Sequence, residues 1–226
     1  MSAAWPRTCR LFLFDLDGTL IDSKADIAHS VNLTLAGLEL PQIPVTRVAT
    51  FVGDGVQKLI ERSLRQTSGT EPDSYQMAQG IALFMKEYER HLLDSTRLYP
   101  GVEAALDRLS WASLGVVSNK PESLSRRVLE GLGVDGRFCT ILGGDSTPFR
   151  KPDPAPLRHA MALCRAASHE TVMVGDSPVD INAGHSAGTI TCGIWGGFGN
   201  RRDLEAAGCD LMVEGVGQLP EFFHPP

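Results

Sequence analysis

The chain has 226 residues, 42% of them hydrophobic and 21% charged, a composition typical of a globular protein with room for one sizeable core and an inserted module. Its formal net charge of -6 argues against a nucleic-acid partner, because a phosphate backbone needs a basic face. No apolar run is long enough to cross a bilayer, and the N-terminal stretch 1–10 lacks the apolar segment of a secretory leader. We therefore predict a cytoplasmic protein with no nucleic-acid partner and no membrane partner.

The five cysteines are scattered along the chain without a C-x-x-C pair. An odd number of cysteines in a sequence where we see no secretory leader indicates a reducing compartment, so we expect free thiols. Cys139 and Cys192 lie in predicted strand regions, where we expect them to act as packing residues.

The first predicted element is a short strand over 11–14, whose four consecutive apolar residues indicate burial on both faces. Asp15 and Asp17 follow at its carboxyl end, where open α/β sheets gather their ligands. Neighbouring carboxylates repel unless a cation or a shared proton lies between them. With the flexible Gly18 and the hydroxyl of Thr19 behind them, they indicate a site for Mg²⁺ and phosphate in which one carboxylate is free to attack. The alternative is a plain turn, since Asp-Gly is a common turn pair.

Residues 23–94 show helical periodicity throughout instead of an alternation of strands and helices. Apolar stripes run along three predicted helices, at Ile27, Val31, Leu35 and Leu38, at Val56, Leu59, Ile60 and Leu64, and at Met77, Ile81, Phe84, Met85, Tyr88 and Leu92. Ser23 and Asp26 have the spacing of a capping box at the start of the first helix. The block predicts an all-helical module inserted after the first strand, which divides the chain into a core of 1–22 and 95–226 and an insert of 23–94.

From residue 99 onward the chain alternates strands with helices. The expected strands cover 114–118, 140–143, 171–175, 189–194 and 211–213, and the expected helices cover 122–132, 154–165 and 178–185. Alternation at this spacing indicates βαβ units and therefore a parallel sheet, which the strand over 11–14 joins. The predicted fold class is α/β.

Two predicted strand-to-helix loops carry candidate phosphate-binding groups. Ser118 and Asn119 precede Pro121, which suits the first position of a helix, so the amides of that helix N-terminus face the loop. Simple capping of the helix by Asn119 is the alternative. Lys151 also precedes a helix start and offers a point charge for a phosphate, although a single lysine is commonly a solvated surface residue.

A third loop of this kind adds further acids. Asp176 directly follows one of the predicted strands and is a candidate metal ligand, because Mg²⁺ takes oxygen ligands that include carboxylates. Asp180 has capping-box spacing with Ser177, which explains it structurally. Asp15, Asp17 and Asp176 would supply the metal site. Since all these loops follow parallel strands, we expect them to meet at one edge of the sheet.

The four loops, taken in order, resemble the motifs of the haloacid dehalogenase superfamily of phosphohydrolases. The matching segments are 15–19, Ser118, Lys151, and 175–177 with Asp180. A closer likeness to the phosphoglycolate phosphatases of that superfamily rests on 14–23, 52–56 and 98–102. The resemblance implies a Rossmann-like three-layer core with a parallel sheet and a small all-helical cap domain inserted after the first strand.

The resemblance also implies roles for the site residues. Asp15 would attack the phosphorus in line and form an aspartyl-phosphate, and Asp17 would protonate the leaving oxygen and then activate water. The groups that hold the transferring phosphoryl oxygens would be Thr19, Ser118, Asn119 and Lys151. Mg²⁺ would lie among the Asp15 side chain, the Asp17 backbone carbonyl and Asp176. Asp180 would support these ligands or make one further metal contact.

The resemblance makes a small phosphorylated metabolite the expected partner, with 2-phosphoglycolate favoured. Gly53 and Gly55 would bring backbone amides near a ligand, and Lys58 and Arg62 on the following helix would meet a substrate carboxylate or a second phosphate. The alternative for the two cations is a solvated face, since Glu61 lies nearby. The other functions considered are a sugar-phosphate or amino-sugar-phosphate phosphatase, a phosphosugar mutase, and a phospho-ligand sensor without turnover. We expect a monomer or a homodimer.

Overall fold

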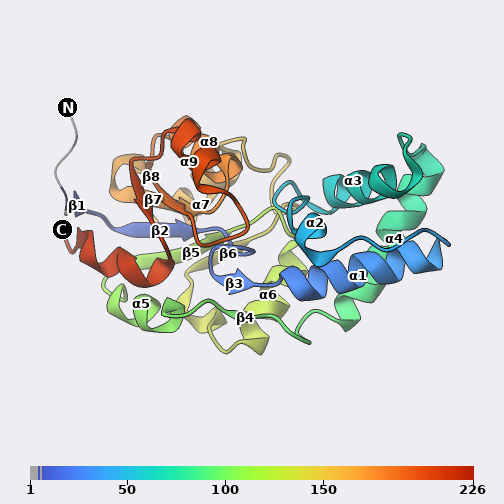
Figure 1. Ribbon diagram of the computed structural model, residues 1–226. Coiled ribbons are helices and arrows are strands. Elements are labelled where there is room, and N and C mark those ends of the chain that lie inside the picture. Colours follow the sequence, from blue (N-terminus) through green and yellow to red (C-terminus); the bar gives the residue numbers. More distant parts are fainter. Residues whose placement is uncertain (1–4, 6) are drawn as a thin grey trace.

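The computed structural model describes residue 5 and residues 7–226, which form a sheet lobe and a helical lobe (Figure 1). Residues 1–4 and 6, on which part of the expectation about a leader rests, lie outside the described residues. The two ends of the described chain meet on the sheet lobe, where β1 (Arg7–Thr8) pairs in parallel with β10 (Phe223–His224). Among the described helices, none combines the length and the apolar character needed to cross a membrane.

The sheet lobe is built on six parallel strands in the order β6-β5-β2-β7-β8-β9. They are β2 (Leu11–Phe14), β5 (Ser113–Val117), β6 (Thr140–Leu142), β7 (Thr171–Gly175), β8 (Ile190–Ile194) and β9 (Leu211–Val213). β2 lies in the middle, and its Phe14 is in register with Val116 of β5 and Val174 of β7. The residues that follow these three strands therefore emerge together at one edge of the sheet.

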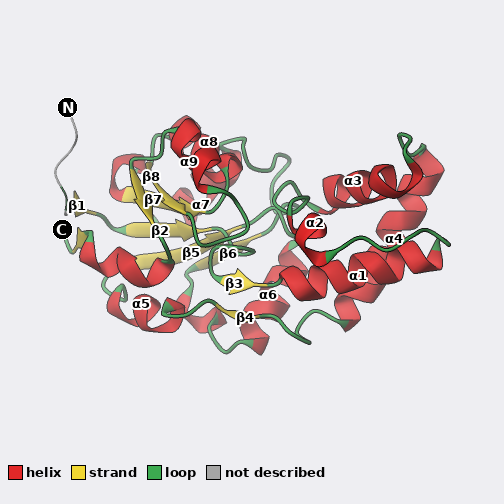
Figure 2. Ribbon diagram, in the orientation of Figure 1, coloured by secondary structure: helices red, strands yellow, loops and turns green. Residues whose placement is uncertain are grey.

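Helices cover both faces of this sheet (Figure 2). One face carries α5 (Val102–Arg108) and α6 (Glu122–Gly131), and the other carries α7 (Ala155–Leu163) and α8 (Pro178–Ala187), with α9 (Arg201–Ala207) beside α8. Because side chains alternate along a strand, Phe12 and Phe14 join the first core and Leu11 and Leu13 join the second. Full burial of each such side chain contributes about 1.5–3 kcal/mol. The three-layer α/β core confirms the predicted fold class.

The helical lobe contains α1 (Lys24–Gly37), α2 (Val45–Ala49), α3 (Val56–Ser68) and α4 (Ser74–Arg90). Its buried side chains come from the predicted apolar stripes and include Val31, Leu59 and Phe84. Two short strands, β3 (Ile21–Asp22) and β4 (Arg97–Leu98), pair antiparallel where the chain enters and leaves this lobe. The lobe is all-helical, as predicted, and α2 is an addition to the predicted helices. The division of the chain at 22/23 and 94/95 stays a prediction.

The start of α1 differs from its predicted capping box. Ser23 stands at the N-cap, where its side chain makes no capping bond to the described residues, and its hydroxyl donates to an Asp17 carboxylate oxygen at 2.6 Å. The buried Asp26 carboxylate accepts hydrogen bonds from the backbone N–H groups of Ser95 and Thr96 and from the Thr96 hydroxyl. The capping prediction is wrong because these donors come from a distant segment. Asp26 thereby ties together the two segments that join the lobes.

The expectation of free thiols is wrong for two of the cysteines. Cys139 and Cys164 form a disulfide with a Cα–Cα distance of 6.5 Å. Cys139 directly precedes β6 and Cys164 ends α7, and a helix that follows a parallel strand runs back toward the start of that strand. The βα unit therefore brings together two residues that are 25 positions apart. Cys9 and Cys192 are free and buried, as packing residues are.

Candidate active site

Asp15 directly follows the central strand β2, and its backbone N–H continues the hydrogen bonding between β2 and β7 by donating to the carbonyl of Val174 at 2.8 Å. The chain then turns at Gly18, whose φ of +89° is a conformation that side chains disfavour. A Cβ at this position would lie 2.3 Å from Asp176 Oδ2. A residue without a side chain is therefore needed here, since the loop after β2 lies directly against the acid that follows β7.

Lys151 is buried between two carboxylates at this edge. Its Nζ lies 2.8 Å from Asp15 Oδ1 and 2.6 Å from Asp180 Oδ1, and only 2% of its side chain is exposed. Burial alone lowers the pKa of the lysine, but the charges of Asp15 and Asp180 outweigh it and raise this pKa to about 12. Lys151 is therefore a permanent cation in the site, and the alternative of a solvated surface lysine is wrong.

Three carboxylates form an acidic cluster beside this lysine. Asp15, Asp176 and Asp180 each offer one oxygen, and the three oxygens lie within 4.8 Å of one another. Burial, followed by the charges of the neighbouring carboxylates, raises the pKa of Asp176 to about 8. Burial also raises the pKa of Asp15 to about 6, although Lys151 opposes the rise. Carboxylates crowded in this way fit a divalent cation, which prefers oxygen ligands and offsets their repulsion.

Hydrogen bonds hold Asp176 and Asp180 in place. Asp176 Oδ2 accepts from the backbone N–H groups of Phe198 at 2.7 Å and Gly199 at 3.1 Å. Asp180 Oδ2 accepts from the hydroxyl and the N–H of Ser177, which confirms the predicted capping box at the start of α8. The loop that supports Asp176 was not predicted to belong to the site. Its glycines were the available signal, because a loop that packs on another backbone needs residues without side chains.

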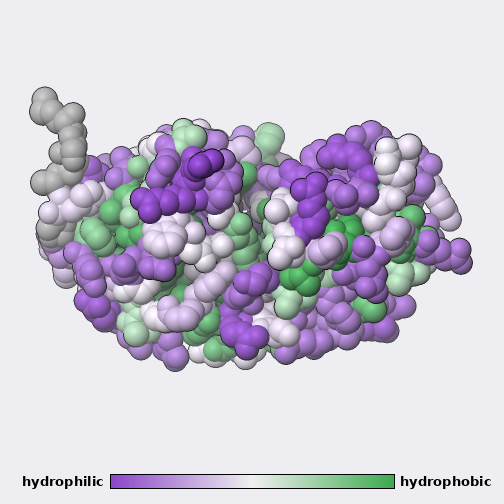
Figure 3. All heavy atoms as spheres, in the orientation of Figure 1, coloured by the Kyte–Doolittle hydropathy of each residue, from purple (hydrophilic) through white to green (hydrophobic). Residues whose placement is uncertain are grey.

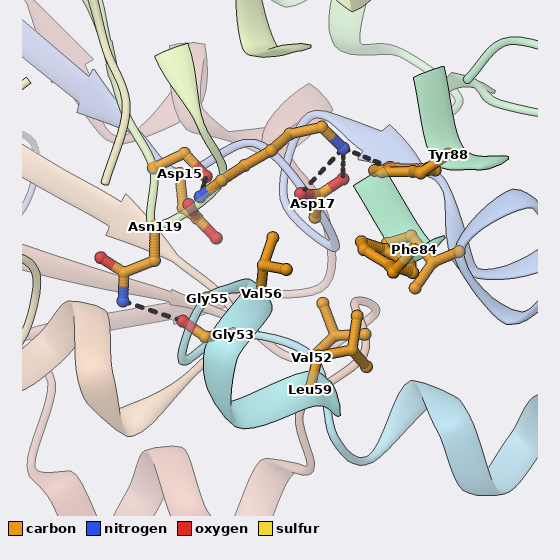
Figure 4. A pocket seen from close by; sticks show the side chains of 13 residues that line it. Asp15, Asp17, Val52, Gly53, Gly55, Val56, Leu59, Phe84, Tyr88 and Asn119 are labelled. Atoms are coloured by element: carbon orange, nitrogen blue, oxygen red, sulfur yellow. Dashed lines mark hydrogen bonds and ion pairs between the residues drawn. The ribbon is translucent and has the colours of Figure 1, made fainter. Parts of the chain in front are cut away.

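The Asp17 carboxylate has its own set of partners. It accepts from the Ser23 hydroxyl at 2.6 Å and from Lys120 Nζ at 3.0 and 3.3 Å. The same ammonium contacts the Tyr88 hydroxyl, and Figure 4 shows dashed lines from Asp17 and Tyr88 to one lysine nitrogen. Lys120 was not predicted as a site residue. Its place between a strand end and Pro121 was the available signal.

Two buried polar atoms at this edge lack a partner. Among the described buried side chains, Thr19 Oγ1 and Asn119 Oδ1 are the atoms without a hydrogen bond. Such an atom costs about 1–3 kcal/mol unless a ligand satisfies it. Asn119 Nδ2 donates to the carbonyls of Gly53 and Lys151, each at 2.9 Å, and the described side chain makes no capping bond to α6. The capping alternative for Asn119 is therefore wrong, and the residue instead links three loops.

Thr19 is buried at the turn that follows β2. Its backbone N–H donates to the carbonyl of Leu16 at 3.2 Å, so the chain curls back after the turn. The residue borders a cavity together with Tyr99 and Gly196. Ser118 is buried beside Asp15, where it lines a small cavity over the strand ends.

A small cavity opens over Asp15 and Asp17, between the two lobes (Figure 4). Its polar side comes from the strand ends and comprises Asp15, Asp17, Ser118, Asn119 and Lys120. Its apolar side comes from the helical lobe and comprises Ile27, Val52, Val56, Leu59 and Phe84. The cavity measures about 50 Å³, which is room for roughly four water molecules. A site of this size and lining suits a small ligand with one strongly anionic end.

Gly53 and Gly55 line this cavity, whereas Lys58 lies outside its lining. Lys58 Nζ pairs with Glu61 at 2.8 Å, and 51% of the lysine side chain is exposed. The solvated-face alternative therefore describes Lys58 correctly. The glycines place the backbone of the helical lobe directly against the strand ends, as the hydrogen bond to the Gly53 carbonyl shows.

Arg62 lies on a separate cleft between the lobes. Its guanidinium pairs with Asp54 at 2.5 Å and donates to the Phe51 carbonyl at 3.0 Å. The cleft measures about 420 Å³ and also reaches Asp17 and Asp176. Figure 3 shows the surface of the molecule hollowed between the lobes. Arg62 is thus near the acidic side of the site, but its charge already has a carboxylate partner.

A carboxylate and a lysine are buried at the end of the central strand, with an acidic cluster beside them and a helical lobe above them. This arrangement in an α/β protein suits an anionic substrate. The family model described as haloacid dehalogenase-like hydrolase matches residues 12–194. The chain belongs to this family. The membership confirms the resemblance inferred from the four motifs.

Named relatives and a solved structure are similar to this chain over nearly its whole length. Phosphoglycolate phosphatase of Neisseria meningitidis serogroup A is 40% identical over 213 residues, which cover 93% of this chain and 91% of that protein. Phosphoglycolate phosphatase of Nitrosospira multiformis is 34% identical over 211 residues, which cover 92% and 93%. The crystal structure of a predicted phosphoglycolate phosphatase from Haemophilus somnus superposes with a TM-score of 0.86 at 31% identity and covers 93% of this chain and 96% of that one. The chain is a haloacid dehalogenase-like phosphatase, a phosphoric monoester hydrolase.

Proposed function

We propose that this protein is a Mg²⁺-dependent phosphatase that hydrolyses a small phosphomonoester through an aspartyl-phosphate intermediate, with 2-phosphoglycolate as the favoured substrate. The observation that carries the proposal is the Asp15 carboxylate, which follows the central strand, lies 2.8 Å from the buried ammonium of Lys151, and adjoins the Asp176 carboxylate. A carboxylate in this setting combines a nucleophile with the positive charge that an approaching phosphate needs.

In the first half-reaction an Asp15 oxygen attacks the phosphorus in line, and the phosphoester bond breaks. Asp17, as the carboxylic acid, gives its proton to the departing oxygen. In the second half-reaction water attacks the phosphorus of the aspartyl-phosphate, and the Asp17 carboxylate accepts the proton of that water. The bond between Asp15 and phosphorus breaks, inorganic phosphate leaves, and the Asp15 carboxylate is restored.

Ser118, Asn119 and Lys151 are proposed to hold the phosphoryl oxygens, Asn119 through its backbone N–H because both hydrogens of its Nδ2 already donate to carbonyls. Their support is that all three are buried and that Asn119 hydrogen-bonds to the backbone of Lys151. The Lys151 ammonium would stabilise the charge on the phosphoryl oxygens while the phosphoryl group is transferred. Thr19 stays in the proposal on the resemblance and on its buried hydroxyl, which has no hydrogen-bond partner among the described residues.

Asp15, Asp176 and the backbone carbonyl of Asp17 would hold the cation. The fit rests on buried carboxylates so close together that their pKa values rise, which makes full ionisation unfavourable without a cation. A bound Mg²⁺ would offset the repulsion between the nucleophile and the phosphate. Asp180, whose two oxygens accept from Lys151 and Ser177, would support the lysine more than the cation.

The helical lobe, residues 23–94 in the predicted division, is proposed to act as a cap that excludes water during phosphoryl transfer.

A cavity of about 50 Å³ favours a small leaving group, and relatives named phosphoglycolate phosphatase make 2-phosphoglycolate the first choice. A sugar phosphate or amino-sugar phosphate would use the same strand ends but bring a larger leaving group. A phosphosugar mutase would return the phosphoryl group to a sugar. The cytoplasmic location and the monomeric or dimeric state stay predictions.

Asp15→Asn tests the proposal. With Mg²⁺ and 2-phosphoglycolate, wild-type protein should release inorganic phosphate, and the variant should lose at least about 10⁴-fold in kcat. Acid-quenched wild-type protein should carry a phosphoryl group on Asp15. The control is Asp73→Asn, at an exposed N-cap of α4, which should keep wild-type turnover. Turnover that persists in a clean Asp15→Asn preparation contradicts the proposal, and a phosphorylated sugar as product would favour the mutase.

A further inference from the structure

We propose that Lys120 recognises a carboxylate on the substrate and so selects an acidic leaving group. This inference rests on the proposed function, whose substrate class it explains. It assigns a role to a buried lysine that the reaction scheme above does not use.

Lys120 brings a positive charge into a cavity whose other wall is apolar. Only 4% of its side chain is exposed, and its Nζ lies 3.0 Å from Asp17 Oδ1 and contacts the Tyr88 hydroxyl. The three N–H donors of the ammonium face Asp17 Oδ1, Asp17 Oδ2 and the Tyr88 hydroxyl, and the donor with the longest contact, 3.3 Å to Asp17 Oδ2, is the one that would turn to a ligand carboxylate. Among the described residues that line the cavity, Lys120 is the sole cation. An anionic group that enters the cavity beyond the phosphate has no other charged partner there.

Proton donation brings a substrate carboxylate next to this lysine. The ester oxygen must approach Asp17 to receive its proton. In 2-phosphoglycolate a single methylene separates the ester oxygen from the carboxyl carbon, so the substrate carboxylate arrives close to Asp17 as well. Once Asp17 has given up its proton, its carboxylate and that of the substrate repel each other unless a cation accompanies them. Lys120 is the cation in contact with Asp17.

Other cations of the site region are paired with carboxylates, as Lys120 is, but they lie outside the lining of the cavity. Lys58, Arg62 and Lys151 each have a carboxylate partner within 2.8 Å. Lys58 is half exposed on α3, and Arg62 lines the separate cleft. Lys151 lies between Asp15 and Asp180, where the phosphoryl group is transferred. Arg150 lies against Gly55, but it is exposed and borders a different cavity. Carboxylate recognition at the leaving-group end therefore falls to Lys120, the cation that lines the cavity.

Tyr88 holds the ammonium of Lys120 in position from the opposite lobe. It comes from α4, and the lysine nitrogen lies 4.5 Å from the centroid of its ring, within the range of a cation–π interaction. Burial raises the pKa of the Tyr88 hydroxyl well above its ordinary value, so the phenol stays neutral. A neutral hydroxyl can accept a hydrogen bond from Lys120 and donate one to a substrate carboxylate. The recognition site is thus complete only when the helical lobe lies over the strand ends.

The test compares two substrates that differ in charge but hardly in shape, 2-phosphoglycolate and its amide, carbamoylmethyl phosphate. Wild-type protein should prefer the acid by about 30-fold in kcat/KM, the effect of one charge-assisted hydrogen bond at a buried site. Lys120→Met keeps the length of the side chain but has no charge, so the preference should fall to near unity. Damage to Asp17 affects both substrates and cancels in the ratio. Lys58→Met is the matched control and should keep the wild-type preference.

An unchanged preference in Lys120→Met, or a preference that disappears in Lys58→Met, overturns the assignment. So does a wild-type protein that hydrolyses the amide as fast as the acid, a result that needs no variant. Should circular dichroism show that Lys120→Met does not fold, Lys120→Gln takes its place, because it keeps a hydrogen-bond donor for Asp17. The proposed function fails by a different result, namely turnover that survives in Asp15→Asn.

Discussion

The Lys151 ammonium and the Asp15 carboxylate form a buried ion pair, 2.8 Å apart, between residues separated by 136 positions in the chain. The pair forms because β2 is a central strand and the loop before α7 reaches the same edge of the sheet. Asp180 binds the same ammonium at 2.6 Å, so one lysine holds two acids. Lys151 therefore stabilises the fold of this edge and the nucleophile at once.

Replacing Lys151 by Met should damage both stability and turnover. The variant keeps the bulk of the side chain but leaves two buried carboxylates without their cation, and removal of one partner from a buried ion pair costs about 3–5 kcal/mol. Turnover should fall about 10²- to 10³-fold, because charge on the transferring phosphoryl group is no longer offset. Urea unfolding and steady-state kinetics at saturating Mg²⁺ measure the two effects. Lys86→Met, on the exposed side of α4, is the control, and a wild-type kcat in Lys151→Met would contradict the role.

Without a divalent cation the protein should lose stability as the pH rises. The pKa of the buried Asp176 is about 8 in the folded protein and 3.8 ordinarily. Between these pH values the folded state keeps a proton that the unfolded chain has released, so raising the pH favours unfolding. Asp176→Asn removes this ionisation. We expect the variant to melt at least about 4 °C above wild type at pH 8 in EDTA, and at the wild-type temperature near pH 4.

Mg²⁺ should reverse the order of the two proteins at pH 8, because a cation stabilises the ionised carboxylates that destabilise the free site. Thermal melts with and without Mg²⁺ at pH 6 and pH 8 measure this difference. Wild type should gain more from Mg²⁺ at the higher pH, and Asp176→Asn should gain little at either. Equal melting temperatures for the two proteins at pH 8 in EDTA would show that Asp176 does not titrate in this way.

Local sequence patterns were sufficient for the elements that position these acids. The apolar run of β7 was predicted with its observed bounds, Thr171–Gly175, since a strand buried on both faces carries a continuous apolar signal. The convergence of Asp15, Lys151 and Asp176 followed from the parallel sheet, whose strands end at a common edge. A site built from strand ends is therefore predictable from backbone topology.

Side-chain partners from distant segments were not predictable in this way. Asp26 has capping-box spacing, but its carboxylate binds the segment that returns from the helical lobe. Lys120 resembles any loop lysine until α4 brings Tyr88 over it. Cys139 and Cys164 carry no pairing signal, and only the return of α7 along β6 brings them together. Spacing along the chain decides which residues share a face, but tertiary packing decides which group meets that face.

Asp26→Asn should lower stability more than a matched change at the surface. The buried carboxylate accepts from three donors on Ser95 and Thr96, and the amide offers one acceptor atom in its place. We expect a loss of about 2–3 kcal/mol, the contribution of hydrogen bonds to a buried charged group. Asp22→Asn, whose carboxylate pairs with the half-exposed Lys24, should lose no more than about 1 kcal/mol. Equal midpoints for the two variants in urea unfolding would contradict the tie between the lobes.

Asn119→Ala should lower turnover while Asn32→Ala should not, although both changes remove side-chain bonds to the backbone. Asn119 Nδ2 bridges the carbonyls of Gly53 and Lys151, which holds the helical lobe against the phosphate-binding loops. Asn32 binds the carbonyl and the N–H of Ile43 within the helical lobe. Each change should cost about 1–3 kcal/mol of stability.

The two variants should separate in kinetics with 2-phosphoglycolate. Asn119→Ala should lose about 10- to 100-fold in kcat/KM, because a small displacement of Lys151 and of the loop at Gly53 misaligns the reacting groups. Asn32→Ala should retain the wild-type value, since its lost contacts lie away from the cavity. If both variants keep wild-type kinetics at equal loss of stability, the Asn119 side chain serves only to join the loops, and its part in aligning the phosphate-binding residues is withdrawn.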